Sequence, residues 1–259
     1  MQVAIKKPSK VKIENAFDKC LLYMFGLPAS LVLIIGDWKT GKTDFALLIA
    51  ERLLEIGLIK EVASNIKTSD PRIKFIADLP SLREWLFYSD RRKTKLYIFD
   101  EAGSHLHRRR SMSRKNIAFV KILPEISKAR AKMIAIMQNP ESIDKELLSP
   151  VWCKGLIIKE NKYRAKFISE FFPEEKEVEF FPVPRTTIPF DPYDIADFSL
   201  TRPKQIPATI RDEDLKILWE WSVNNKSTRQ LDIHPMKLNR IVRKFVKQIL
   251  EKEYSEQKL

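Results

Sequence analysis

A loop between an apolar strand and a helix carries the clearest chemistry in the chain. Leu31 to Ile35 are apolar, and they run directly into the pattern Gly36-x-x-x-x-Gly41-Lys42-Thr43. Glycines allow a backbone path that turns successive N–H groups toward phosphate oxygens, and the positive N-terminal end of the following helix adds to this attraction. Lys42 would reach the β and γ phosphates, and the Thr43 hydroxyl would bind magnesium. The sequence therefore predicts a nucleoside triphosphate site formed by Gly36, Asp37, Trp38, Lys39, Thr40, Gly41, Lys42 and Thr43.

A second motif supplies two adjacent carboxylates. Leu96 to Phe99 are apolar and predict a buried strand, and Asp100 and Glu101 follow at its end. Asp100 could hold the magnesium ion beside Thr43, while Glu101 could orient and deprotonate an attacking water. Hydrolysis as well as binding is therefore chemically plausible.

An amide follows a third apolar strand. The segment MIAIM, residues 133–137, ends at Gln138 and Asn139. If this strand lies between the two already described, the amide of Gln138 would face the γ phosphate and could sense it or position water. The alternative is an ordinary strand-to-helix turn that begins at Asn139-Pro140.

The elements that position these residues alternate along the chain. Strands are predicted at Leu31 to Ile35, Glu61 to Asn65, Leu96 to Phe99, Met133 to Met137 and Leu156 to Lys159. Helices are predicted at 42–56, 80–88, 116–130 and 140–148, and Pro124 is expected to break or restart the third of these. This alternation is typical of an α/β fold with a parallel sheet flanked by helices.

The stretch from Cys20 to Gly36 has no charge and superficially resembles a membrane span. Pro28 and Ser30 interrupt it, and a helix through it would be shorter than the roughly 20 apolar residues that a bilayer requires. We therefore expect a helix over 13–25 and no membrane or targeting segment. Cys20 and Cys153 lie far apart, which is typical of reduced, cytoplasmic cysteines. The spacing of the three histidines predicts no zinc site.

The pattern changes after residue 160. Residues 162–167 and 177–181 alternate apolar and polar side chains, which predicts antiparallel strands in a hairpin. The region 182–208 then holds six prolines and predicts an extended linker. The last fifty residues have a helical pattern: a helix at 212–223, a short one at 228–231, and a long one at 236–253 that follows Pro235. This order resembles a helix-turn-helix.

Four regions follow from these patterns. We expect a basic segment and short helix over 1–28 and a nucleotide-binding domain with a terminal β-hairpin over 29–181. A proline-rich linker over 182–208 would connect it to a helix-turn-helix-like DNA-binding domain over 209–259.

The charge balance points to a polyanionic partner. Lys and Arg number 47 against 34 Asp and Glu, a net charge of +13. Nucleic acid is the simplest partner, although a basic solvated surface is the alternative. Two clusters stand out. The first could contact DNA or a neighbouring subunit, one arginine acting as a finger on that subunit's γ phosphate, and comprises Arg108, Arg109, Arg110, Arg114 and Lys115. The second would lie along DNA or pack back on the main domain, and comprises Lys226, Arg229, Lys237, Arg240, Arg243, Lys244 and Lys247.

The motifs GDWKTGKT and LYIFDE and the tract KARAKMIAIMQNPESIDKELLS together resemble P-loop ATPases of the additional-strand, catalytic-glutamate division. Within it they are most similar to the FtsK/HerA-like group, with its Zot-like relatives, and to ATPases of archaeal viruses and plasmids. The resemblance covers about residues 29 to 160. DnaA/Orc-type AAA+ initiators are the rival resemblance, but strands and prolines follow residue 160 where those proteins carry a helical lid.

The resemblance implies ATP and Mg2+ as cofactors, with Lys42 and Thr43 on nucleotide and metal, and Asp100 on the metal. It also implies Glu101 as base, Gln138 as sensor, strand order 5-1-4-3-2, and a hexamer or a DNA-nucleated assembly. We therefore expect an ATPase that acts on DNA, in replication initiation or remodelling of viral or plasmid DNA. The alternatives are a translocating or packaging motor and an ATP-gated DNA-binding switch without significant turnover.

Overall fold

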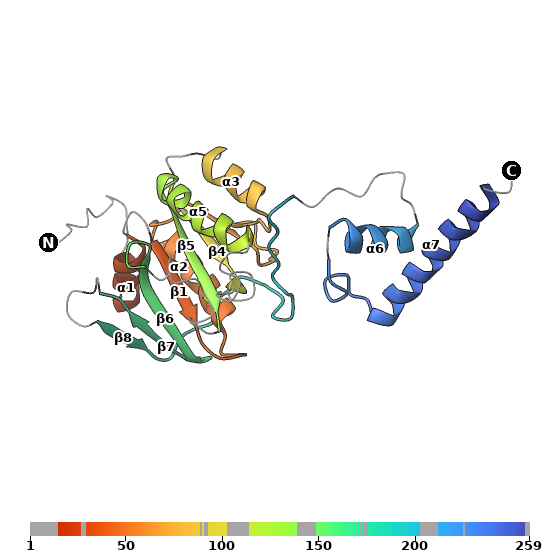
Figure 1. Ribbon diagram of the computed structural model, residues 1–259. Helices are drawn as coiled ribbons and strands as arrows, with labels where there is room; N and C mark the ends of the chain where they lie inside the picture. Colours follow the sequence, from red (N-terminus) through yellow and green to blue (C-terminus); the bar gives the residue numbers. More distant parts are fainter. Residues whose placement is uncertain are drawn as a thin grey trace. The chain divides into compact units, whose positions relative to one another are not determined.

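Eight strands form one sheet whose centre is parallel (Figure 1). The computed structural model describes residues 15–26, 30–88, 90, 93–102, 114–138, 149–170, 172, 176–202, 212–224 and 226–256. The strands are β1 Ser30–Ile35, β2 Glu61–Ser64, β3 Ile73–Phe75, β4 Lys95–Phe99, β5 Ala131–Met137, β6 Cys153–Asn161, β7 Arg164–Ile168 and β8 Glu177–Phe180. Their order across the sheet is β3-β2-β4-β5-β1-β6-β7-β8.

The expected strand order 5-1-4-3-2 is confirmed as the sequence β6-β1-β5-β4-β2 within this sheet. All pairings from β3 to β6 are parallel, and β7 and β8 extend the sheet by antiparallel pairing, as the alternation after residue 160 predicted. The short edge strand β3 was not expected. The carboxyl ends of β1, β4 and β5 therefore meet at one edge of the sheet.

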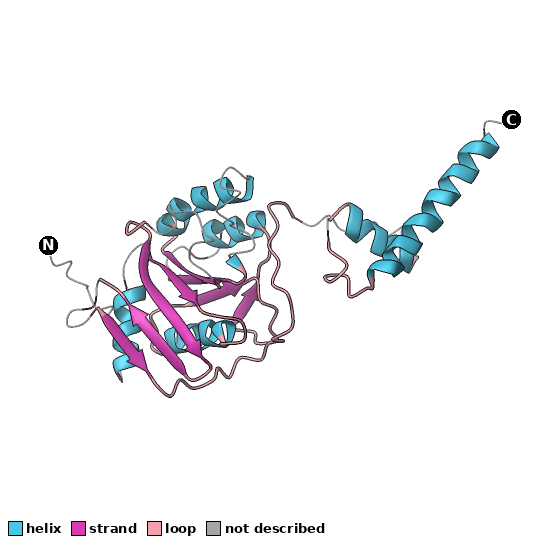
Figure 2. Cartoon of the chain, turned by 60° about the horizontal axis from the view of Figure 1, so that its bottom comes forward, coloured by secondary structure: helices cyan, strands magenta, loops and turns pink. Residues whose placement is uncertain are grey.

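Helices cover both faces of the sheet (Figure 2). They are α1 Ala16–Phe25 and α2 Lys42–Glu55 on one face, and α3 Leu79–Tyr88 and α5 Arg114–Lys128 on the other. The predicted helix at 140–148 lies outside the described residues. Pro124 does not break α5, contrary to expectation. Pro124 itself is exposed, whereas Ile122 and Ile126 are buried against the sheet, and this packing keeps the helix continuous.

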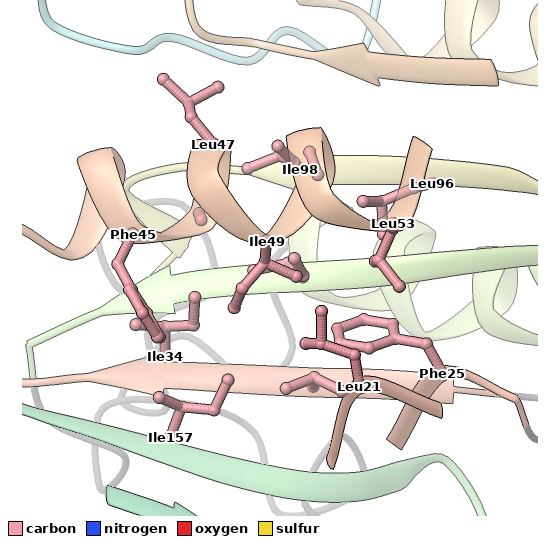
Figure 3. Close-up of a cluster of buried hydrophobic side chains, with 14 of the residues drawn as sticks. Leu21, Phe25, Ile34, Phe45, Leu47, Ile49, Leu53, Leu96, Ile98 and Ile157 are labelled. Atoms are coloured by element: carbon pink, nitrogen blue, oxygen red, sulfur yellow. The ribbon is translucent and has the colours of Figure 1, made fainter. Parts of the chain in front are cut away.

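The strands alternate between two apolar cores. Val32 and Ile34 of β1 face α1 and α2, while Leu31 and Leu33 face α3 and α5. Figure 3 shows the first core, where apolar side chains of α2 lie against β1, β6 and α1. The labelled residues of this contact include Phe45, Ile49, Leu53, Ile34, Ile157, Leu21 and Phe25. Because α2 is held along most of its length, the loop that precedes it is fixed at both ends.

Residues 182–201, which we call the strap, belong to the α/β unit. The chain divides into two compact units, Met1–Thr201 and Arg202–Leu259. Val183, Ile188 and Phe198 of the strap are buried. The strap is also hydrogen-bonded to the segment between β3 and α3: Ser199 N–H donates to Ala77 O at 2.9 Å. The extended linker predicted over 182–208 is therefore part of the α/β unit as far as residue 201, because apolar residues between the prolines are buried there.

The second unit contains α6 Glu213–Ser222 and α7 Pro235–Glu256. Asp212 caps α6 by accepting a hydrogen bond from Leu215 N–H at 3.0 Å. The short helix expected at 228–231 is instead a series of turns. Only Leu238 and Ile241 are buried among its described apolar residues. Across the described parts of the chain, no helix combines the length and apolar character that crossing a membrane requires.

Candidate functional site

The loop after β1 has a backbone that glycine makes accessible. Gly36 has φ +154° and Gly41, which precedes α2, has φ +83°. A Cβ on Gly36 would lie 2.3 Å from the carbonyl oxygen of Lys159 on β6. Lys39 between them also has a positive φ, +61°. The loop is therefore a tight reversal pressed against β6, of the kind that turns N–H groups inward.

Two side chains of the loop bond back to its own backbone. Thr40 Oγ1 donates to Asp37 O at 2.9 Å. Lys42 Nζ donates to Gly36 O at 2.9 Å and to Asp37 O at 2.7 Å. The ammonium group therefore lies over the mouth of the loop, on a helix whose N-terminus points at the same place.

Asp100 follows β4, which is separated from β1 by β5, and it contacts the helix that begins directly after the loop. Thr43 Oγ1 donates to Asp100 Oδ2 at 2.8 Å, although the two residues come from different crossovers. The other carboxylate oxygen, Oδ1, accepts the N–H of Glu101 at 2.8 Å. The structure thus brings together Lys42, Thr43, Asp100 and Glu101, which the sequence had assigned to one site.

Burial sets the proton affinities of the two carboxylates. Burial raises the pKa of Asp100 above its ordinary 3.8, and the hydrogen bonds from Thr43 and Glu101 oppose this increase. Burial, and then the charge of Asp100, raise the pKa of Glu101 above 4.5. Burial lowers the pKa of Lys42, whereas Asp100 and Glu101 raise it. The three groups therefore share one electrostatic environment.

Glu101 occupies a strained backbone position. Its φ is +55°, in the left-handed region that side chains other than glycine and asparagine rarely adopt. The residue is half-buried directly after the strand end. Such strain is frequent where a side chain must be aimed at a ligand.

Gln138 lies at the same edge. It follows β5, which lies between β1 and β4 as the sequence analysis required. Because Met137 pairs with Ile35, Gln138 is level with Gly36 at the start of the loop. Its side chain is exposed. Asn139 lies outside the described residues.

The oxygen groups of Thr43 and Asp100 suit magnesium. This ion prefers hard oxygen ligands, and in phosphate sites it takes one or two from protein and the rest from phosphate and water. Among the described residues, no group of three or more His, Cys, Asp or Glu is arranged to hold a metal by itself. The donor set therefore fits a magnesium ion that arrives with a nucleotide.

The sequence analysis missed Asn65. This residue follows β2 and is buried, and its side-chain amide bonds to the Asp100 peptide. A polar amide at the carboxyl end of a strand beside the acidic strand was the available signal. No known motif drew attention to it.

The basic clusters are only partly described. Arg108, Arg109 and Arg110 lie outside the described residues, and Arg114 and Lys115 are the first residues of α5. In the second unit, two of the candidate cations are paired with acids of α6: Lys244 Nζ is 2.8 Å from Asp214 Oδ2, and Lys226 Nζ is 2.9 Å from Glu220 Oε2. The exposed candidates are Arg229, Lys237, Arg240, Lys244 and Arg243. Lys247 lies on α7.

The tight glycine-containing loop between β1 and α2, together with the extra strand β5 between β1 and β4, identifies the fold. It is that of a P-loop nucleoside triphosphatase. The inserted β5 and the pair Asp100-Glu101 match the arrangement of the additional-strand, catalytic-glutamate division.

No known protein-family profile matches the sequence, and no curated protein matches it. Several solved structures are similar to the chain. One is the N-terminal domain of zonular occludens toxin from Neisseria meningitidis, with 16% identity, a TM-score of 0.43, and coverage of 61% of this chain and 95% of that chain. The genome packaging NTPase B204 from Sulfolobus turreted icosahedral virus 2 has 10% identity, a TM-score of 0.46, and coverage of 61% and 99%. The flagellar accessory protein FlaH from Methanocaldococcus jannaschii has 14% identity, a TM-score of 0.46, and coverage of 71% and 99%.

Proposed function

We propose that the protein is a magnesium-dependent ATPase that acts on DNA. The observation that carries this proposal is the 2.8 Å hydrogen bond between Thr43 Oγ1 and Asp100 Oδ2. It joins the phosphate-binding loop to the acidic strand, so that the two oxygen groups expected on magnesium are adjacent. Lys42, whose pKa is influenced by both carboxylates, lies beside them.

Each residue has a distinct role in this proposal. The loop N–H groups and Lys42 would bind the phosphates, and Thr43 and Asp100 would hold a Mg2+ ion, which would neutralise phosphate charge. Glu101 accepts a proton from the attacking water, because its raised pKa makes it a stronger base than an exposed glutamate. Gln138 orients that water or contacts the γ phosphate from β5.

The proposal of DNA as the partner rests on charge. The chain carries a net charge of +13, and the second unit exposes Arg229, Arg240 and Arg243. Phosphate groups are the partner that such a surface attracts most strongly. Replication initiation or remodelling of viral or plasmid DNA would use this combination of nucleotide hydrolysis and DNA contact.

Steady-state ATP hydrolysis tests the site. Lys42→Ala and Glu101→Gln should each lower kcat by about 100-fold or more, because each removes a group that acts on the transition state. Lys74→Ala on the exposed edge strand β3 is the matched control and should leave kcat unchanged. Hydrolysis that persists in both site variants would show that the site is wrongly assigned.

Turnover with and without duplex DNA, combined with gel filtration, separates the proposed roles. DNA-stimulated turnover by a monomer or a DNA-nucleated assembly is the result expected for an initiator or remodelling ATPase. DNA-stimulated turnover by a hexamer would instead indicate a translocating or packaging motor. Negligible turnover with ATP-dependent DNA affinity would indicate a switch.

A further inference from the structure

We propose that Asn65 is a positioning residue that holds the Asp100-Glu101 backbone in its active arrangement. This inference rests on the proposed ATPase function and extends it to a residue outside the recognised motifs. Asn65 follows β2 at the carboxyl edge of the sheet and is 1% exposed.

The side chain of Asn65 makes a two-point contact with one residue. Its Oδ1 accepts the Asp100 N–H at 2.8 Å, and its Nδ2 donates to the Asp100 carbonyl oxygen at 3.1 Å. The primary amide of an asparagine side chain carries a neutral donor and a neutral acceptor on one carbon atom, so it can bond the N–H and the C=O of one backbone residue at the same time. The amide therefore satisfies both polar groups of the Asp100 backbone.

The Asn65 side chain bonds to the backbone of Asp100 just beyond the point where β2 and β4 stop pairing. The parallel ladder between β2 and β4 runs as far as Ser64 and Ile98, and Asn65 N–H still reaches Ile98 O at 3.4 Å. β2 ends at Ser64, and among the described residues no strand pairs with the Asp100 backbone on that side. The Asn65 side chain takes the place of the missing strand residue.

Fixing the Asp100 backbone also fixes both catalytic carboxylates. The Asp100 side chain is aimed at Thr43, and its Oδ1 accepts the Glu101 N–H, which sets where Glu101 begins. Glu101 has φ +55°, an unfavourable conformation for a residue with a side chain, which persists only when its surroundings determine it. Asn65 determines it from the β2 side without touching either carboxylate.

The strap also contacts the side chain of Asn65. Asn65 Nδ2 lies 3.4 Å from the carbonyl oxygen of Asp197, and the neighbouring Phe198 packs against Phe99 with ring centroids 5.2 Å apart. Burial under the strap excludes water that would compete for the amide. The Asn65 hydrogen bonds are therefore stronger than they would be at an exposed turn.

Two substitutions test this role. Asn65→Ala removes both hydrogen bonds, and Asn65→Asp keeps the shape but replaces the Nδ2 donor by an oxygen that faces the Asp100 carbonyl. We expect kcat to fall by about 100-fold and the magnesium concentration for half-maximal activity to rise by about 10-fold or more. The affinity for an ATP analogue without magnesium should change by less than about 2-fold, since Asn65 does not contact the phosphate loop.

The matched control is Tyr97→Phe. Tyr97 Oη donates to Ile76 O at 2.8 Å, so this variant loses a buried side-chain to backbone hydrogen bond on β4 without touching Asp100. It should lose stability but keep the kcat and the magnesium requirement of the wild type. Equal losses of activity in Tyr97→Phe and Asn65→Ala would overturn the proposal, because general destabilisation would then explain both.

A readout that does not depend on activity separates this inference from the proposed function. The Asp100 N–H is protected by Asn65 Oδ1, so hydrogen exchange at Asp100 should accelerate by about 10-fold or more in Asn65→Ala and stay unchanged in Tyr97→Phe. A wild type that does not hydrolyse ATP would contradict the proposed function. Unchanged exchange at Asp100, or wild-type kcat and magnesium dependence in both Asn65 variants, would contradict the role of Asn65.

Discussion

At the scale of single residues, the candidate site holds two carboxylates in an electrostatically unfavourable environment. Asp100 is a charged group that is 9% exposed, and Glu101 lies next to it with a pKa raised by burial and by this neighbour. Neither arrangement favours folding. Both suit a site in which a cation and a proton must be bound, since the same burial strengthens each of these interactions.

Asp100→Asn should stabilise the protein and abolish magnesium-dependent hydrolysis. Burial raises the Asp100 pKa above 3.8, so the native state binds its proton more tightly than the unfolded state, and stability falls as pH rises through this range. An asparagine has the same shape and removes the buried charge. At neutral pH we expect the free energy of unfolding to rise by about 1 kcal/mol and Tm by about 2–4 °C.

Thermal unfolding at several pH values checks this prediction. The difference in Tm between Asp100→Asn and the wild type should shrink as pH is lowered below 3.8, where the wild-type carboxyl group is protonated in both the folded and the unfolded state. A variant that is less stable than the wild type at neutral pH would show that the hydrogen bonds to Asp100 outweigh its desolvation.

We expect the pH profile of kcat to fall on its acidic side, because Glu101 is the proposed base. A general base acts only when deprotonated, so kcat should rise with pH through the pKa of Glu101, which lies above its ordinary 4.5. The pH dependence of kcat measures this value. The residual activity of Glu101→Gln should lack this fall, and a wild-type fall at or below pH 4.5 would argue against Glu101 as the base.

At the scale of elements, the strap is the part of the fold that most affects the site from outside it. Its Phe198 is 3% exposed and contacts Phe99 at the end of β4, directly before Asp100. Its backbone also accepts from Asn65 and exchanges hydrogen bonds with residues 77 and 79. The strap therefore holds the carboxyl ends of β2 and β4 together.

Phe198→Ala should destabilise the α/β unit by about 3–5 kcal/mol, the usual loss when a buried phenylalanine is truncated. Tyr193→Ala, in the same strap but at 88% exposure, is the matched control and should change the free energy of unfolding by less than about 0.5 kcal/mol. Urea denaturation measures both. Similar stabilities of the two variants would mean that the strap does not contribute to the core.

The elements that could be predicted from sequence are those with a strong local signal. β1, α2 and β4 combine long apolar runs with a recognisable loop or acidic end. The strand β3 has only three residues, and Phe198 lies among prolines that indicate a linker. Asn65 was not assigned because no motif marks it and its role depends on a side-chain contact between β2 and β4, whose paired residues lie 34 positions apart in the sequence. Tertiary contacts decided these cases.

At the scale of the whole molecule, the excess of basic residues is the basis for proposing DNA as the partner. The net charge of +13 is large, but the second unit neutralises part of its own cluster, since Lys244 is bonded to Asp214 and Lys226 to Glu220. Arg243 lies one residue before Lys244 on α7, is exposed, and has no ion pair within the described residues. Arg243 and Lys244 thus differ, because only Lys244 is paired with an acid within the described residues.

This difference gives a test of DNA binding by the second unit in the full-length protein. Each phosphate contact contributes about 0.9 to the slope of log affinity against log salt concentration. Arg243→Ala should therefore weaken duplex binding at low salt and reduce the slope by about 1. Lys244→Ala, the matched control, should have a smaller effect, because Asp214 already competes with phosphate for its ammonium group. Fluorescence anisotropy with a labelled duplex at several salt concentrations measures both slopes.

Identical slopes in the wild type and in Arg243→Ala would show that DNA does not contact this part of α7, and would move the search for the DNA surface to the α/β unit.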